Sequence, residues 1–169
     1  MKYCPQCTQP LVDVEIDDRL RKKCPSKNCG FVHWGNPVPV VAVIVETEQG
    51  VVMARNVAWP RDFYSVITGF LEASESPMNC ARRETREELG LTVSHIELVG
   101  CYPFERQNQV IITYYARAEG EITLNHELDD YRLVARENLE VYPAGPGLGI
   151  IDWLKQHGIT PAIREFPKS

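Results

Sequence analysis

The sequence predicts an α/β fold in which a mixed β-sheet lies between helices as an α/β/α sandwich, preceded by a small cysteine-containing unit. Three observations lead to this prediction. From residue 37 onward, apolar and β-branched segments recur along the chain, and two amphipathic helical segments interrupt or follow them. In front of them, two pairs of cysteines flank short alternating stretches. At 169 residues, the chain suits one full domain with a small appendage.

The composition is that of a soluble globular protein, with 44% hydrophobic and 24% charged residues. The net charge of -5 argues against a general nucleic-acid binder, which is normally basic, and an anionic phosphate substrate would need a metal ion and local arginines. No apolar run approaches the length of a membrane span, and MKYCPQC lacks the apolar region of a secretory signal. We therefore expect a cytoplasmic protein without membrane contact.

Residues 1–36 are predicted to form a unit of their own. Two alternating stretches, 11–16 and 19–23, read as a hairpin between two cysteine knuckles. Four thiolates placed in this way can close a tetrahedral zinc site, which lets a segment too small for its own core fold. The unit looks like a zinc ribbon, although four residues separate the second pair instead of the commoner two; the alternative is four reduced structural cysteines. The predicted zinc ligands are Cys4, Cys7, Cys24 and Cys29.

The charge of this unit indicates its role. Its six basic and four acidic side chains give +2, and four thiolates with one zinc ion add -2, so the net charge is about zero. We therefore expect a structural or dimer-forming ribbon and not a nucleic-acid clamp.

The second predicted domain covers residues 37–160 and is followed by a C-terminal tail at 161–169. Its first strand, 38–45, is almost wholly apolar, as expected for a strand buried on both faces. A closing helix is predicted over 147–157, where apolar residues recur at helical spacing before Gly158. The other predicted strands cover residues 51–54, 65–70, 92–101, 109–118 and 131–134.

A helix from Pro77 to Leu89 is predicted by its ends, because Ser76 can cap it, Pro77 suits its first position and Gly90 suits its exit. Positions three and four apart share a helix face, so three glutamates, at positions 84, 87 and 88, lie together. Like charges at this spacing repel, whereas a bound hard cation reverses the penalty. Oxygen ligands of this kind suit Mg²⁺ or Mn²⁺. Met78, Ala81, Thr85 and Leu89 form the neighbouring stripe that is expected to face the core.

The spacing from Gly69 to Leu91 resembles the Nudix box, G-x5-E-x7-R-E-U-x-E-E-x-G-U, in which U is a bulky apolar residue. Every fixed position matches, and only Thr85 replaces the usual aliphatic residue. The resemblance implies a Nudix α/β sandwich in which Glu84, Glu87, Glu88 and the carbonyl group of Gly69 bind the metal. It also implies that Glu84 is the leading candidate for the catalytic base. Arg83 and Glu75 resemble the family's orienting pair.

A further carboxylate is expected from a loop downstream of the box. Glu127 lies where Nudix enzymes commonly have one, and we predict that it binds metal or serves as a base. Asp129 and Asp130 are rivals, and a solvated acidic loop is the alternative for all three.

Candidate substrate contacts are aromatic and basic residues near the box. The alternatives are core packing for the aromatic residues and solvated loops for the arginines. The aromatic candidates for stacking on a nucleobase are Trp59, Phe63, Tyr64 and Phe70, and the candidates for phosphate contact are Arg61 and Arg106. Cys80 and Cys101 are expected to be small buried residues, since the chemistry needs no covalent nucleophile.

Together, ribbon and box resemble NADH pyrophosphatases and zinc-ribbon relatives that act on FAD or ADP-ribose. The former have S-Q-P-W-P-F-P-x-S after the box; here Tyr102-Pro103-Phe104 stands in about that place without the leading Ser-Gln-Pro. The implied activity is cleavage of the pyrophosphate bond of a nucleoside diphosphate linked to another moiety. Alternatives are clearance of noncanonical nucleoside triphosphates and a nucleotide-sensing or RNA-binding protein. Capped RNA is the one nucleic-acid substrate considered, and a homodimer is expected from the resemblance.

Overall fold

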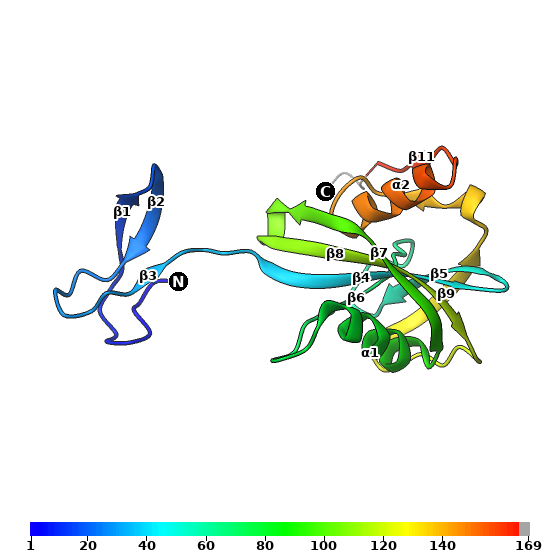
Figure 1. Ribbon diagram of the computed structural model, residues 1–169, viewed down its shortest axis with the longest axis horizontal. Helices are drawn as coiled ribbons and strands as arrows, with labels where there is room; N and C mark the ends of the chain where they lie inside the picture. Colours follow the sequence, from blue (N-terminus) through cyan, green and yellow to red (C-terminus); the bar gives the residue numbers. More distant parts are fainter. Residues whose placement is uncertain (166–169) are drawn as a thin grey trace. The chain divides into compact units, whose positions relative to one another are not determined.

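The computed structural model describes residues 1–165 and divides the chain into two compact units, Met1–Pro37 and Val38–Ser169. The N-terminal unit contains a three-stranded antiparallel sheet of order β1-β2-β3, formed by β1 (Val12–Ile16), β2 (Arg19–Lys23) and β3 (Val32–His33) (Figure 1). The predicted hairpin is present, and its turn residues Asp17 and Asp18 both have positive φ, as a tight hairpin turn requires. The short strand β3 was not predicted.

The second unit is built on a six-stranded mixed sheet. Its main path runs β7-β8-β4-β5-β9, and β6 pairs with β4 beside β5. The pairing of β4 with β8 is parallel, whereas the other pairings are antiparallel. The strands are β4 (Val38–Thr47), β5 (Gly50–Asn56), β6 (Ile67–Phe70), β7 (Thr92–Phe104), β8 (Gln109–Glu119) and β9 (Leu128–Val134).

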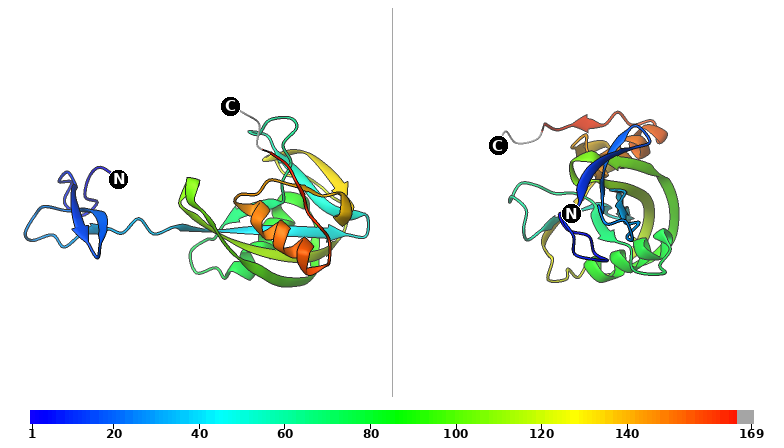
Figure 2. Two further views of the ribbon diagram at one scale, coloured as in Figure 1. Left: turned by 90° about the horizontal axis from the view of Figure 1, so that it is seen from above. Right: turned by 90° about the vertical axis from the view of Figure 1, so that its left-hand side faces the viewer.

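The central strand β4 is buried on both faces, as its apolar sequence predicts. Val41, Val43 and Val45 face a core that includes Ala81 and Leu89 of α1 (Pro77–Leu89). The intervening residues of β4 face a second core, which includes Trp153 of α2 (Pro146–Gln156). The two helices therefore cover opposite faces of the sheet (Figures 1 and 2). The predicted α/β/α sandwich with a mixed sheet is confirmed.

Helix α1 has the predicted bounds and end structures. The N–H of Asn79 donates to the side-chain oxygen of Ser76 over 3.2 Å, and Gly90 ends the helix in the left-handed conformation with φ 72°. The predicted core stripe was wrong at Met78, which is 43% exposed. Cys80 lies in the core instead, because the helix turns its face toward β4 and β6.

Short elements complete the unit. The 3₁₀ helices η1 (Glu105–Gln107) and η2 (Arg136–Asn138) follow β7 and β9, and β10 (Glu140–Val141) pairs in parallel with β11 (Ala162–Ile163). The predicted tail thus contains a short strand, and its residues 166–169 lie outside the described part of the chain. Within residues 1–165, no helix has the length and apolar character needed to cross a membrane.

Candidate active site and cysteine centre

The strand β6 meets helix α1 at Gly69, and this contact builds the centre of the candidate active site. A Cβ atom on Gly69 would lie 2.0 Å from Oε1 of Glu84 and 2.4 Å from its Cγ. Only a residue without a side chain lets the Glu84 carboxylate lie against the backbone of β6. The structure therefore brings together Gly69 and Glu84, two residues that the resemblance to the Nudix box implies as metal ligands.

Arg83 ties the loop after β6 to helix α1. Its Nε and Nη2 each donate to one oxygen of Glu75 over 2.9 Å, and Nη2 also donates to the carbonyl oxygen of Phe70 over 3.1 Å. Its Nη1 donates to Glu84 over 2.7 Å and to Glu87 over 3.0 Å. The paired hydrogen bonds from Arg83 lower the pKa of Glu75 to about 2. Arg83 thus fixes both the loop and two of the three helix glutamates.

Glu88 is the most buried of the three, with 6% of its surface exposed. Burial, and then the charges of Glu84, Glu127 and Glu87, raise its pKa to about 8. Burial also raises the pKa of Glu84, although Arg83 partly opposes the shift. Among residues 1–165, no donor hydrogen-bonds to the Glu88 carboxylate. The cluster therefore has more buried negative charge than its one arginine balances, and a hard cation fits it.

The buried glutamates open into a cleft of about 430 Å³. Arg83, Glu84, Glu88 and Gly69 line it, together with Glu127 from the loop before β9. Glu87 lies next to these residues on α1, with 49% of its side chain exposed.

Asp129 and Asp130, the predicted rivals of Glu127, point elsewhere. Asp129 accepts a hydrogen bond from Nε of Arg55 over 2.7 Å, and Asp130 accepts one from the Tyr64 hydroxyl over 2.5 Å. Both carboxylates have partners outside the glutamate cleft, so Glu127 is the one of the three that lies with the cluster.

A second cleft, of about 360 Å³, lies on the α2 side of the sheet and is mainly apolar. Its aromatic rings contact one another: Phe63 stacks on Tyr142 with centroids 4.9 Å apart, and Trp59 meets Phe63 edge-on at 5.0 Å. All four predicted aromatic residues, Trp59, Phe63, Tyr64 and Phe70, line this cleft. Sequence reasoning did not find Phe104, Gln107, Gln109 and Tyr142, which also line it. Phe104 belongs to the segment Tyr102-Pro103-Phe104, whereas the other three residues show no local sequence signal of a binding site.

The two clefts meet at β6. Successive residues of a strand point to opposite faces, and pairing with β4 places Gly69 opposite Val41 and Phe70 opposite Val40. Ile67 and Gly69 therefore face the glutamates, whereas Thr68 and Phe70 face the aromatic cleft. Both clefts are lined by Trp59, Thr68, Gly69 and Phe70. The aromatic cleft and the glutamate cleft are therefore neighbours.

Two arginines predicted to contact phosphate are not in either cleft. Arg106 lies exposed in η1, and Arg61 lies in an exposed loop, where its carbonyl oxygen accepts from Arg55 over 2.8 Å. The expectation that Cys80 and Cys101 are both buried was wrong for Cys101, which is exposed. It lies on β7 at the end of the main sheet path, where β8 is the one paired strand among residues 1–165.

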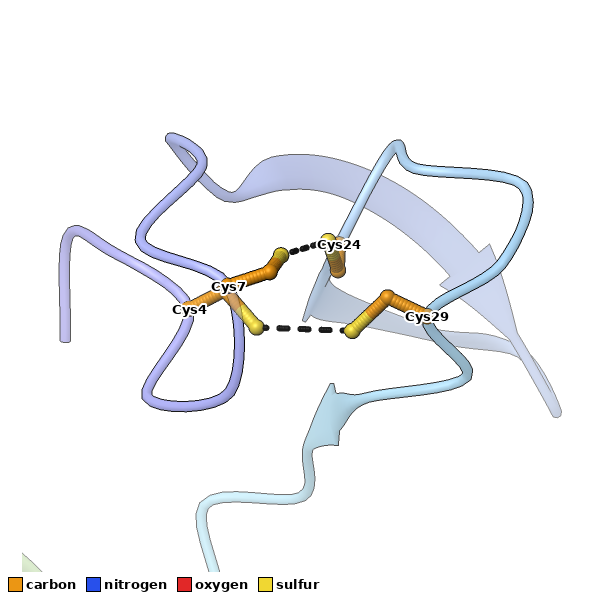
Figure 3. Close-up of side chains that lie close together, drawn as sticks. All are labelled: Cys4, Cys7, Cys24 and Cys29. Carbon is orange, nitrogen blue, oxygen red and sulfur yellow. Dashed lines mark hydrogen bonds between the residues drawn. The ribbon is translucent and has the colours of Figure 1, made fainter.

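The N-terminal unit brings its four predicted cysteines together (Figure 3). The Sγ atoms of Cys4 and Cys29 lie 3.6 Å apart, those of Cys7 and Cys24 lie 3.4 Å apart, and all four lie within 4.8 Å of one another. Tetrahedral zinc with Zn–S bonds of about 2.3 Å needs sulfur atoms about 3.8 Å apart. The spacing therefore fits one metal ion.

The ionisation of these thiols also fits a cation. Burial opposes ionisation of Cys4, but backbone N–H groups of Gln6 and Cys7 outweigh it, and its pKa falls to about 7. For Cys24, a hydrogen bond from Ser26 favours ionisation, but burial and the neighbouring thiols prevail and raise the pKa to about 12. One thiolate suppresses the next, and a divalent cation would remove that conflict.

The family model described as "NUDIX domain" matches residues 36–151, which include the whole glutamate cleft. The chain belongs to the Nudix hydrolase family. The Nudix box thus corresponds to the end of β6, the loop fixed by Arg83, and helix α1.

Similar Nudix proteins include one named NAD-capped RNA hydrolase NudC from Pseudomonas putida strain KT2440, with 28% identity over 172 residues. The match covers 98% of this chain and 60% of that protein. A protein of the same name from Vibrio vulnificus is 28% identical over 148 residues, covering 86% of this chain and 55% of that one. The chain thus spans little more than half the length of these relatives.

Among solved structures, a Nudix hydrolase from Nitrosomonas europaea is similar over 97% of both chains, with 26% identity and a TM-score of 0.73. A MutT Nudix hydrolase from Burkholderia pseudomallei has 16% identity and a TM-score of 0.59 over 69% of this chain and 98% of that one. The second similarity concerns the fold alone.

Proposed function

We propose that this Nudix protein is a divalent-metal-dependent hydrolase that cleaves the pyrophosphate bond of a dinucleotide of the NAD type, free or at the end of a capped RNA. FAD and ADP-ribose belong to the same chemical class. One observation supports the proposal above the others: the buried carboxylates of Glu84 and Glu88, whose charge Arg83 balances only in part, adjoin an aromatic cleft across one strand. The names of the relatives from P. putida and V. vulnificus point to the same class of substrate.

The metal-binding residues in this proposal are Glu84, Glu87, Glu88 and the carbonyl oxygen of Gly69, which would hold Mg²⁺ or Mn²⁺. When bound, such an ion supplies charge neutralisation at the phosphate oxygens and lowers the pKa of bound water. Hard oxygen ligands suit both ions, which commonly share their coordination with substrate phosphates.

The protein's own groups position the reactants and take up a proton. Arg83 keeps the Glu84 carboxylate in place through a 2.7 Å hydrogen bond, so we assign Arg83 a positioning role. Two carboxylates in the cleft, Glu84 and Glu127, can accept the proton of the attacking water. Because the Glu84 carboxylate is already engaged by Arg83, Glu127 has the freer lone pairs for this step.

The aromatic cleft would hold the ring system of one of the two moieties that the pyrophosphate group joins. Trp59, Phe63, Tyr64 and Phe70 offer ring faces and edges for stacking, and Trp59 and Phe70 also border the glutamate cleft. Arg106 has no direct role in substrate binding here, because it lies outside both clefts.

The decisive experiment is a hydrolysis assay with NAD, NADH, FAD, ADP-ribose, an NAD-capped RNA and nucleoside triphosphates, each with Mg²⁺ or Mn²⁺ and with EDTA. Two monophosphates from a dinucleotide, lost with EDTA and in Glu84→Gln but retained in the exposed-strand control Glu97→Gln, would support the proposal. Pyrophosphate from a triphosphate would instead indicate nucleotide clearance. Nucleotide binding without any turnover would indicate a sensor.

For the cysteine centre we propose a structural Zn²⁺ ion held by Cys4, Cys7, Cys24 and Cys29. Two of the four thiols are buried, and the sheet beside them is too small to supply a core alone. Metal binding would then contribute directly to the folding free energy of this unit.

A further inference from the structure

Among the polar side chains that line the aromatic cleft, Gln109 lies on a strand that pairs with a neighbour on each side. Gln109 begins β8, where it pairs with Val38 of β4 and with Phe104 of β7. Two residues further along β8, Ile111 pairs with Val40. Side chains two apart on a strand share a face, so Gln109 lies on the same face as Ile111, which belongs to the core that borders the cleft.

Gln109 is partly buried, and its amide has no partner among residues 1–165. Of the side chains and backbone groups that the structure describes, none hydrogen-bonds to it. A glutamine amide offers two N–H donors and one carbonyl acceptor, which are available to a ligand in the cleft. Three neighbours of Gln109 in the sheet that also line the cleft, Val40, Phe104 and Ile111, are apolar and offer it no side-chain hydrogen bond.

We propose that Gln109 recognises the edge of the ring that enters the aromatic cleft, pairing its amide with a hydrogen-bond donor and a neighbouring acceptor on that edge. This inference rests on the proposed function and specifies its substrate. The aromatic rings bind the face of a planar group, whereas the Gln109 amide, which lies beside them in the cleft, reads its edge. The other amide that lines the cleft, Gln107, is exposed in η1. Two parts of an NAD-type substrate present this pattern: adenine, through its amino group and a ring nitrogen, and nicotinamide, through its carboxamide.

The test compares three dinucleotides in wild-type protein and in Gln109→Met, a substitution of similar length that removes the amide. In 3-acetylpyridine adenine dinucleotide, a methyl group replaces the carboxamide NH₂. In 1,N6-etheno-NAD, the amino group and N1 of adenine are blocked. The control is Gln156→Met, which makes the same change at an exposed position at the end of α2.

Wild-type protein and the control should hydrolyse NAD with a kcat/KM on the order of 10-fold higher than that of one of the two analogues. In Gln109→Met this ratio should fall toward one, because the discriminating group is gone. A collapse with the acetylpyridine analogue assigns nicotinamide to the cleft, and a collapse with the etheno analogue assigns adenine. Ratios that are unchanged in Gln109→Met would overturn the proposal, since exclusion by bulk alone does not depend on an amide.

A second measurement separates this inference from the catalytic proposal. Binding of AMP, ethenoadenosine monophosphate, nicotinamide mononucleotide and its acetylpyridine analogue is followed by calorimetry, which needs no turnover. Selective binding that is lost in Gln109→Met, together with no hydrolysis of any dinucleotide, would support Gln109 as the reader and reject the proposed activity. The opposite result is hydrolysis of a dinucleotide, together with equal binding of each monophosphate and its analogue by wild-type protein and by Gln109→Met. That result would support the proposed activity and reject Gln109 as the reader.

Discussion

The contact between β6 and helix α1 gives the sharpest prediction, the substitution Gly69→Ala. The new Cβ would lie 2.0 Å from Oε1, 2.1 Å from Cδ and 2.4 Å from Cγ of Glu84. Ordinary carbon–oxygen contact is about 3.4 Å, so the carboxylate must move by more than about 1 Å. Glu84 is held by Arg83 on the other side, and the movement therefore also breaks a charge-assisted hydrogen bond of 2.7 Å.

The expected result is a loss of about 100-fold in kcat, because a displacement of about 1 Å in a catalytic site has an effect of that size. The free energy of unfolding should fall by only about 1.5–3 kcal/mol, the usual contribution of a hydrogen bond to a charged group. The assay is metal-dependent hydrolysis of the best dinucleotide, with thermal unfolding recorded on the same samples.

The matched control is Gly30→Ala, since a Cβ at Gly30 meets nothing within 4 Å and its backbone tolerates a side chain. This variant should retain the wild-type kcat and unfolding temperature. A Gly69→Ala protein with wild-type kcat and metal dependence would refute the reasoning, because the Glu84 carboxylate would then not need its position against β6.

Two further predictions concern the zinc content of the N-terminal unit and the pH-dependent stability of the second unit. Cys4→Ser should lower the bound zinc from one equivalent to well below one, as measured by atomic emission. The control Cys101→Ser, at an exposed cysteine, should leave the zinc content unchanged. Full zinc content in Cys4→Ser would contradict the four-cysteine site. In the second unit, hydrogen bonds from Arg136 hold the pKa of Glu46 below its ordinary value of 4.5, so this pair stabilises the fold above about pH 4.5 and loses its effect as the pH falls through the lowered value. Urea unfolding should show Glu46→Gln less stable than wild type at pH 6, with a smaller difference near pH 3; a difference independent of pH would contradict this sign.

Local sequence was sufficient for the parts of the site that lie within one element. Helix α1 begins and ends as predicted because its caps, Ser76 and Gly90, act on backbone groups a few residues away. The spacing of three and four residues placed the glutamates together for the same reason. The cysteine pairs could likewise be read as one cluster, because each knuckle is short and a hairpin joins them.

Tertiary structure decided which distant residues join the site. Glu127 lies with the glutamates while Asp129 and Asp130 turn to Arg55 and Tyr64, and no sequence pattern separates the three. Met78 and Cys101 were misplaced because exposure depends on which face of a helix or strand a neighbour covers. Gln109 and Tyr142 reach the aromatic cleft through strand register and the packing of separate segments. Helix caps and helical spacing are set by interactions over a few residues, so the local sequence predicts them. Strand register and packing are set by contacts between segments far apart in the chain, and no local sequence pattern specifies those contacts.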